Sequence, residues 1–138
     1  MPEKSGISNV RSMHAAILVN NDFGEGMQSE RLQELQQLAA SDQIKVVAVA
    51  EGKRKRPDPR TFVGSGKAEE IVRLIDDTGA DVVIFNHDLT PAQQRNLMLH
   101  FNCPVIDRTS LILDIFAQRA KSHEGKLQVE LAQLEHLA

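Results

Sequence analysis

A short basic segment is the first stretch of the sequence whose residue types could do specific chemistry. Residues 53–60 hold five basic side chains and one acidic side chain; the basic ones are Lys53, Arg54, Lys55, Arg56 and Arg60. The 138-residue chain has a formal net charge of −3, so the 130 residues outside this +4 segment carry −7. Most charge runs are merely solvated surface. The contrast in sign favours contact with a polyanion, because lysine and arginine displace the counterions of phosphate groups.

A glycine-containing turn, Gly64-Ser65-Gly66-Lys67, follows and could hold a phosphate group. In a P-loop, spaced glycines expose backbone N–H groups to the phosphates, a lysine reaches the β and γ phosphates, and a hydroxyl binds Mg²⁺. Here Thr61 stands in the place of the first glycine and Ala68 in that of the hydroxyl residue. We therefore expect a flexible turn that opens a helix. The residues kept as weak candidates for nucleotide binding are Gly64, Ser65, Gly66 and Lys67, and Lys67 is also a candidate for nucleic-acid binding.

Other residues of potentially reactive type carry less weight. Asn86-His87-Asp88 follows a predicted strand, where parallel sheets place their ligand sites, but such residues are also frequent in turns, and we favour a turn. The remaining histidines lack the spacing of metal ligands. Cys103 precedes a proline and is more typical of a small buried side chain than of a nucleophile. The sequence thus predicts no catalytic residue and no metal site in this chain.

The apolar pattern predicts the elements that position these residues. Short apolar runs typical of strands occur at residues 15–19, 44–50, 82–85 and 104–106, and we expect the second to be covered on both faces. Helical spacing of apolar residues follows each run, at residues 30–39, 68–78, 91–101 and 111–120. Ser29 could cap the first helix, and Thr90-Pro91-Ala92-Gln93 is a specific helix start. This alternation predicts an α/β fold, a four-stranded, mainly parallel sheet flanked by helices, with the strand order open.

Three segments are expected along the chain: a disordered lead-in at residues 1–13, an α/β subdomain at 14–121, and the start of a long coiled-coil-like helical hairpin at 122–138. Leu127, Leu131, Leu134 and Ala138 are spaced as along a coiled-coil seam, and the chain stops within that pattern. We therefore expect a truncated hairpin on a monomer that could self-associate through this helix. With one cysteine, no apolar run of the ~20 residues that span a bilayer and no secretory signal, the sequence points to the cytoplasm and to no membrane partner.

Five stretches between residues 15 and 138 share a family pattern. They are Arg56–Lys67, Leu89–Leu97, Val105–Thr109, Leu111–Ala120 and Glu124–Leu134. Together they resemble the HflX family of translational GTPases. The resemblance implies an N-terminal α/β subdomain, then a long antiparallel helical hairpin, then a Ras-like G domain that holds GTP and Mg²⁺.

The same resemblance implies association with the large ribosomal subunit and its rRNA, in ribosome splitting or rescue, translation or ribosome biogenesis. We expect this chain to be the non-catalytic rRNA-binding part, without a cofactor of its own and next to the G domain of the same polypeptide. Some family members are described as handling ATP or remodelling RNA through this part. The alternative is therefore a nucleotide-binding α/β domain with weak ATPase activity, using the turn at Gly64–Lys67 and the turn at Asn86–Asp88.

Overall fold

A four-stranded parallel sheet forms the centre of the computed structural model, which describes residues 13–121. Its strands are β1 (Ala15–Asp22), β2 (Lys45–Lys53), β3 (Val82–Phe85) and β4 (Val105–Asp107). They lie in the order β2-β1-β3-β4, and all three pairings are parallel. The predicted α/β fold is confirmed, and the order that the sequence left open places β1 and β3 in the middle.

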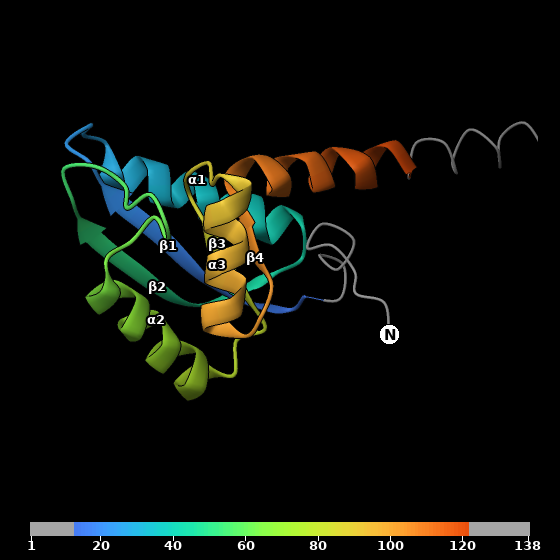
Figure 1. The fold of residues 1–138 in the computed structure, drawn as a ribbon. Helices are drawn as coiled ribbons and strands as arrows, with labels where there is room; N and C mark the ends of the chain where they lie inside the picture. The colour runs from blue at the N-terminus through green and yellow to red at the C-terminus, as the bar shows by residue number, and fades with distance from the viewer. Residues whose placement is uncertain (1–12, 122–138) are drawn as a thin grey trace, which may run out of the picture.

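Helices cover both faces of this sheet (Figure 1). They are α1 (Gln28–Ser41), α2 (Ser65–Thr78), α3 (Pro91–Phe101) and a helix at residues 108–121. One apolar core joins α1 and the helix at 108–121 to the sheet through Leu35 and Leu111. A second core joins α2 and α3 to the opposite face through Ile71 and Leu97. Because side chains alternate across a strand, Leu18 faces the first core and Val19 the second.

The predicted helix start at Thr90 is confirmed in detail. The Thr90 side chain accepts a hydrogen bond from the Gln93 backbone N–H, the Gln93 side chain accepts one from the Thr90 N–H, and Pro91 occupies the first turn. This capping box satisfies two donors that the first turn would otherwise leave unpaired. The end of α3 is also defined, because Asn102 adopts a left-handed conformation there.

Several expected boundaries were wrong. The first helix begins at Gln28 after a left-handed Met27 with no side-chain cap, so Ser29 lies inside α1 and does not cap it. Strand β1 continues past Val19 to Asp22, because residues 20–22 pair with the end of β2. For the same reason Lys53 is the last residue of β2 and not part of the loop. Met13, placed in the disordered lead-in by the sequence, is 4% exposed in the first core.

Strand β2 is contacted on both faces, as predicted, by α1 on one and by α2 on the other. It lies at the edge of the sheet, however, where Val46, Val47 and Val49 are only half-buried. An edge strand has a neighbour on one side only, and its β-branched residues do not reveal that position.

Within residues 13–121 no helix is long and apolar enough to cross a membrane. The predicted coiled-coil seam at Leu127–Ala138 and the rest of the expected hairpin lie outside the described residues.

Candidate nucleic-acid interface

The carboxyl ends of the four strands bring the candidate residues to one edge of the sheet. Since all strands are parallel, the segments that follow them leave the sheet on the same side. The basic loop follows β2, Asn86 and His87 follow β3, and Arg108 follows β4. This is the edge at which open α/β sheets bind their ligands.

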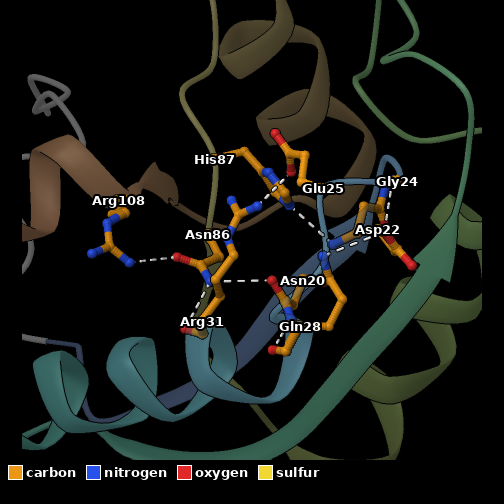
Figure 2. A network of polar contacts seen from close by, with 10 residues as sticks. Asn20, Asp22, Gly24, Glu25, Gln28, Arg31, Asn86, His87 and Arg108 are labelled. Carbon is orange, nitrogen blue, oxygen red and sulfur yellow. Dashed lines mark hydrogen bonds and ion pairs between the residues drawn. The ribbon is translucent and has the colours of Figure 1, made fainter.

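A buried carboxamide, Asn86, links the elements at this edge (Figure 2). Asn86 is fully buried, and its Nδ2 donates to Asn20 Oδ1 at 3.1 Å and to the Arg31 carbonyl oxygen at 3.0 Å. Its Oδ1 accepts from Arg108 Nη1 at 3.0 Å, and Arg108 Nη2 also donates to Glu34 at 3.2 Å. The sequence favoured a simple turn here. The structure instead makes Asn86 the polar connection between β1, β3, α1 and the helix at 108–121.

His87 is held next to this network in its neutral form. Its Nε2 accepts a hydrogen bond from the Asn21 backbone N–H at 2.9 Å, so the proton of the neutral ring is on Nδ1. The ring lies against Phe23 and Phe62, with centroids 5.4 and 4.9 Å away. Burial, and after it the charge of Arg31, lower the pKa of His87 to about 4, and the charges of Glu25 and Asp88 oppose this shift. His87 is therefore uncharged at neutral pH.

This histidine predicts a pH dependence of stability. Its pKa in the folded chain, about 4, lies below the ordinary 6.5, so protonation favours the unfolded chain. The contribution is fully present above pH 6.5 and is lost as the pH falls towards 4. We expect a decrease in the free energy of unfolding of roughly 2 kcal/mol, allowing for the part of the ring that solvent reaches. Urea unfolding of the wild type and of His87→Gln across this range measures it. Glutamine keeps an acceptor but does not titrate, so parallel profiles would contradict the prediction.

The basic loop has a defined structure at its far end. Asp58 and Phe62 exchange two backbone hydrogen bonds of 2.9 Å, which close a tight turn. The Asp58 carboxylate accepts from the backbone N–H groups of Arg60 and Thr61 at 2.7 and 3.1 Å, and these bonds lower the pKa of Asp58. Phe62 has φ of 67°, a left-handed conformation that is strained for an aromatic residue. The turn is thus stabilised from within despite that strain.

Helix α3 anchors the same turn. Gln93 Nε2 donates to the Asp58 carbonyl oxygen at 2.7 Å, and Asn96 Nδ2 donates to the Arg60 carbonyl oxygen at 3.0 Å. The side chains that these contacts leave in solvent are the basic ones: Lys53, Arg54, Lys55, Arg56 and Arg60 are all exposed. The end of β2 and the loop after it therefore expose five cations beside a turn that α3 holds in place.

The five cations do not form one cluster. Lys55 and Arg56 line a cavity of about 420 Å³ at the carboxyl edge of the sheet, together with Arg31 and Arg108. Lys53 and Arg54 lie near the start of α2, and Arg60 lines a different hollow of about 260 Å³ between α2 and α3. The sequence had not singled out Arg31 or Arg108. The position of Arg108 directly after a strand was a usable signal, whereas nothing in the sequence distinguished Arg31.

The charges at this edge are partly balanced. Arg31 pairs with Glu25, and Arg108 pairs with Glu34 at 3.2 Å. Lys55 and Arg56 form no ion pair within residues 13–121, so their charge is available to an anion from outside. Asp88 also lines the cavity and opposes this charge in part, so Lys55 and Arg56 are the unpaired cations that the cavity offers.

The remaining candidate, Lys67, is half-buried and already bonded. Its ammonium donates to the Glu51 carbonyl oxygen and to Glu70 Oε1 at 2.9 Å. A P-loop lysine needs a free ammonium to reach a phosphate. Nucleotide binding by the turn at Gly64–Lys67 stays a prediction that these contacts do not favour.

Two further groups bear on possible chemistry. In the part of the chain that the structure describes, no three His, Cys, Asp or Glu side chains gather so that they could hold a metal ion. Burial raises the pKa of the Cys103 thiol to about 11, with the charge of Asp81 adding to the effect. The thiol is therefore protonated at neutral pH and a poor nucleophile.

Comparison with known proteins identifies relatives of this chain. A family model described as the N-terminal domain of GTP-binding GTPases matches residues 29–117. The chain is 56% identical over 123 residues to the GTPase HflX of Escherichia coli, covering 89% of this chain and 29% of that protein. It is 53% identical over 119 residues to the GTPase HflX of Alkalihalophilus pseudofirmus, covering 86% and 28%. The chain thus spans less than a third of either relative.

Solved structures of GTP-binding proteins share the fold. A crystal structure of SsGBP in complex with GDP aligns with a TM-score of 0.63 at 27% identity, covering 89% of this chain and 35% of that one. A GTP-binding protein from Sulfolobus solfataricus, also in complex with GDP, aligns with a TM-score of 0.61 at 26% identity, covering 90% and 37%.

Proposed function

Since the chain belongs to the HflX family of GTPases, we propose that it is the part of such an enzyme that binds the ribosomal RNA of the large subunit. The observation that carries the proposal is the placement of the basic loop. Five exposed cations lie between the end of β2 and a turn that is anchored to α3, on a chain whose other residues are net negative. Such a concentration of positive charge at one edge of the sheet favours RNA contact there over the rest of the surface.

The wider roles follow from the family. We propose that the complete protein is a cytoplasmic GTPase in which a G domain outside this chain binds GTP with Mg²⁺ and hydrolyses it. This chain would contribute no catalytic group, because it lacks a complete P-loop, and it would act beside the G domain of the same polypeptide. The biological setting that we propose is ribosome splitting or rescue, translation or ribosome biogenesis.

Cosedimentation with purified ribosomal subunits tests the proposal. The 138-residue chain should pellet with large subunits, and less with small subunits at equal concentration. Binding should weaken steeply as salt increases, since phosphate contacts release counterions. Equal binding to both subunits, or none to the large one at low salt, would contradict the proposal.

The nucleotide-binding alternative lacks comparable support. Its lysine, Lys67, is bonded to Glu51 and Glu70, and its second turn contains Asn86, whose carboxamide is fully used within the fold. Neither turn therefore offers a free cationic side chain to a triphosphate.

A further inference from the structure

Helix α2 begins without a cap. Its N-cap residue is Gly64, which has no side chain that could accept a hydrogen bond from the first turn. That turn also has no acidic residue. The backbone of Ala68 is the first to donate within the helix, to the Gly64 carbonyl oxygen at 3.0 Å. The N–H groups of Ser65, Gly66 and Lys67 therefore have no helical acceptor, and they form the positive end of the helix dipole.

Cations gather around this positive end. The guanidinium of Arg54 lies over Gly64, with Nη1 2.5 Å from where a Cβ of that residue would be. Lys53 and Lys67 line the same cavity, which has a volume of about 180 Å³. Glu70 balances Lys67, but Lys53 and Arg54 form no ion pair within the described part of the chain. Like charges around a helix N-terminus repel one another unless an anion lies between them.

A buried side chain without a partner lines the same cavity. Asn21 is 1% exposed and its Oδ1 has no hydrogen-bond partner, although its backbone N–H is bonded to His87. A Cβ on Gly52 would lie 3.2 Å from Asn21 Oδ1 and 2.9 Å from Lys67 Cε. The glycine at position 52 thus keeps open the space between Asn21 and α2. A buried carboxamide normally has a hydrogen-bond partner, so the unpaired and occluded Oδ1 would gain one if the side chain turned towards a donor in the cavity.

We propose that this cavity binds a phosphate group, between the N–H groups at the start of α2 and the cationic ends of Lys53 and Arg54. Asn21 would bond a hydroxyl next to that phosphate through Oδ1, or a phosphate oxygen through Nδ2 after rotation of the carboxamide. The phosphate belongs to an RNA backbone, in which the 2′-hydroxyl supplies the donor that Asn21 Oδ1 needs. This source rests on the proposed function, since a free nucleotide offers the same phosphate chemistry.

Two substitutions at Gly66 test the site. Nothing lies within 4 Å of a Cβ built at Gly66, so Gly66→Ala and Gly66→Asp both fit. Both remove a glycine from a helix, and we expect both to raise Tm by about 2–8 °C. Alanine leaves the N–H groups and the charge unchanged and is the matched control. Aspartate brings a carboxylate to the place of the phosphate, so it should abolish phosphate binding in a chain that is more stable.

The measurement is ¹H–¹⁵N NMR of the 138-residue chain during titration with inorganic phosphate. The backbone signals of Ser65, Gly66 and Lys67 and the side-chain signals of Asn21 should shift in the wild type and in Gly66→Ala. They should not shift in Gly66→Asp. Absence of these shifts in the wild type, or equal shifts in Gly66→Asp, would overturn the site.

Three further titrations identify the source, using single-stranded RNA, DNA of the same sequence, and a nucleoside triphosphate. RNA should bind more tightly than DNA, and Gly66→Asp should lower its log–log salt slope by about 0.7, the value for one single-strand phosphate. A triphosphate that binds at least tenfold more tightly than inorganic phosphate, while RNA does not compete, would overturn the RNA source. RNA binding unaffected by Gly66→Asp would overturn this site and leave the proposed function intact. Phosphate binding in this cavity without any RNA binding would leave the site intact and overturn the proposed function.

Discussion

Replacing the five cations Lys53, Arg54, Lys55, Arg56 and Arg60 together by serine should weaken the binding of large ribosomal subunits on the order of 10³-fold at about 0.1 M salt. Each phosphate contact contributes about 0.7 to 0.9 to the log–log salt slope, and not every side chain engages, so the slope should fall by roughly 3 to 4. The 10³-fold factor follows from this fall in slope. The electrostatic contribution to binding vanishes near 1 M salt, and 0.1 M lies about one decade below that concentration. Cosedimentation at several salt concentrations measures both quantities.

A matched control separates the loop from net charge. Five other exposed basic residues carry the same total charge away from the loop: Lys45, Arg73, Arg95, Arg119 and Lys121. Their joint replacement by serine gives the same net charge and should change the slope by less than about 1. Neither variant should lose its fold, since exposed side chains usually contribute within about 0.5 kcal/mol each. Equal effects of the two variants would show that overall charge, and not the placement of the loop, governs binding.

The buried network at the carboxyl edge leads to the second large effect. Asn86→Ala should lower the free energy of unfolding by about 2–4 kcal/mol, because it removes three hydrogen bonds and leaves buried partners unpaired. The most costly loss is the donor to Asn20 Oδ1, since Asn20 is 1% exposed and cannot turn to water. Urea denaturation followed by circular dichroism provides the measurement.

Asn96→Ala is the matched control for this prediction. Asn96 is also an asparagine with a carboxamide bonded to a backbone carbonyl, but it makes one such bond, to Arg60, near solvent. Its loss should cost about 0.5–1.5 kcal/mol. If Asn86→Ala were no more destabilising than Asn96→Ala, the network would be an incidental contact and not the connection between the four elements.

Asn86 also shows where sequence reasoning reached its limit. Its position after a strand was visible, because an apolar run of β-branched residues ends at Phe85. Its role was not, because the partners Asn20 and Arg108 are far away in sequence and no local pattern connects them. A buried asparagine and a turn asparagine have the same neighbours along the chain. Only the strand order, which puts β3 beside β1, distinguishes them.

In the proposed phosphate cavity, too, the sequence indicated the local turn but not the residues that surround it. The turn at Gly64–Lys67 is recognisable in the sequence from its glycines, and Thr61 and Ala68 stand there in place of two P-loop residues. The sequence could not show that Lys67 turns away to Glu51 and Glu70, or that Asn21 and Arg54 take its place. Those residues come from the ends of β1 and β2, which meet only because the two strands pair in parallel.

What the sequence determined by itself was local. Apolar runs and helical spacing predicted four strands and four helices, and the Thr90 cap was correct to the residue, because periodicity and capping act within a few positions of the chain. The concentration of positive charge at residues 53–60 was equally plain. The tertiary structure decided the edge position of β2, the extension of β1 to Asp22, and the division of the basic loop between two sides of the Asp58–Phe62 turn. Each of these depends on hydrogen bonds between segments that are distant in sequence, and a composition or a spacing carries no information about which distant partner a segment will find.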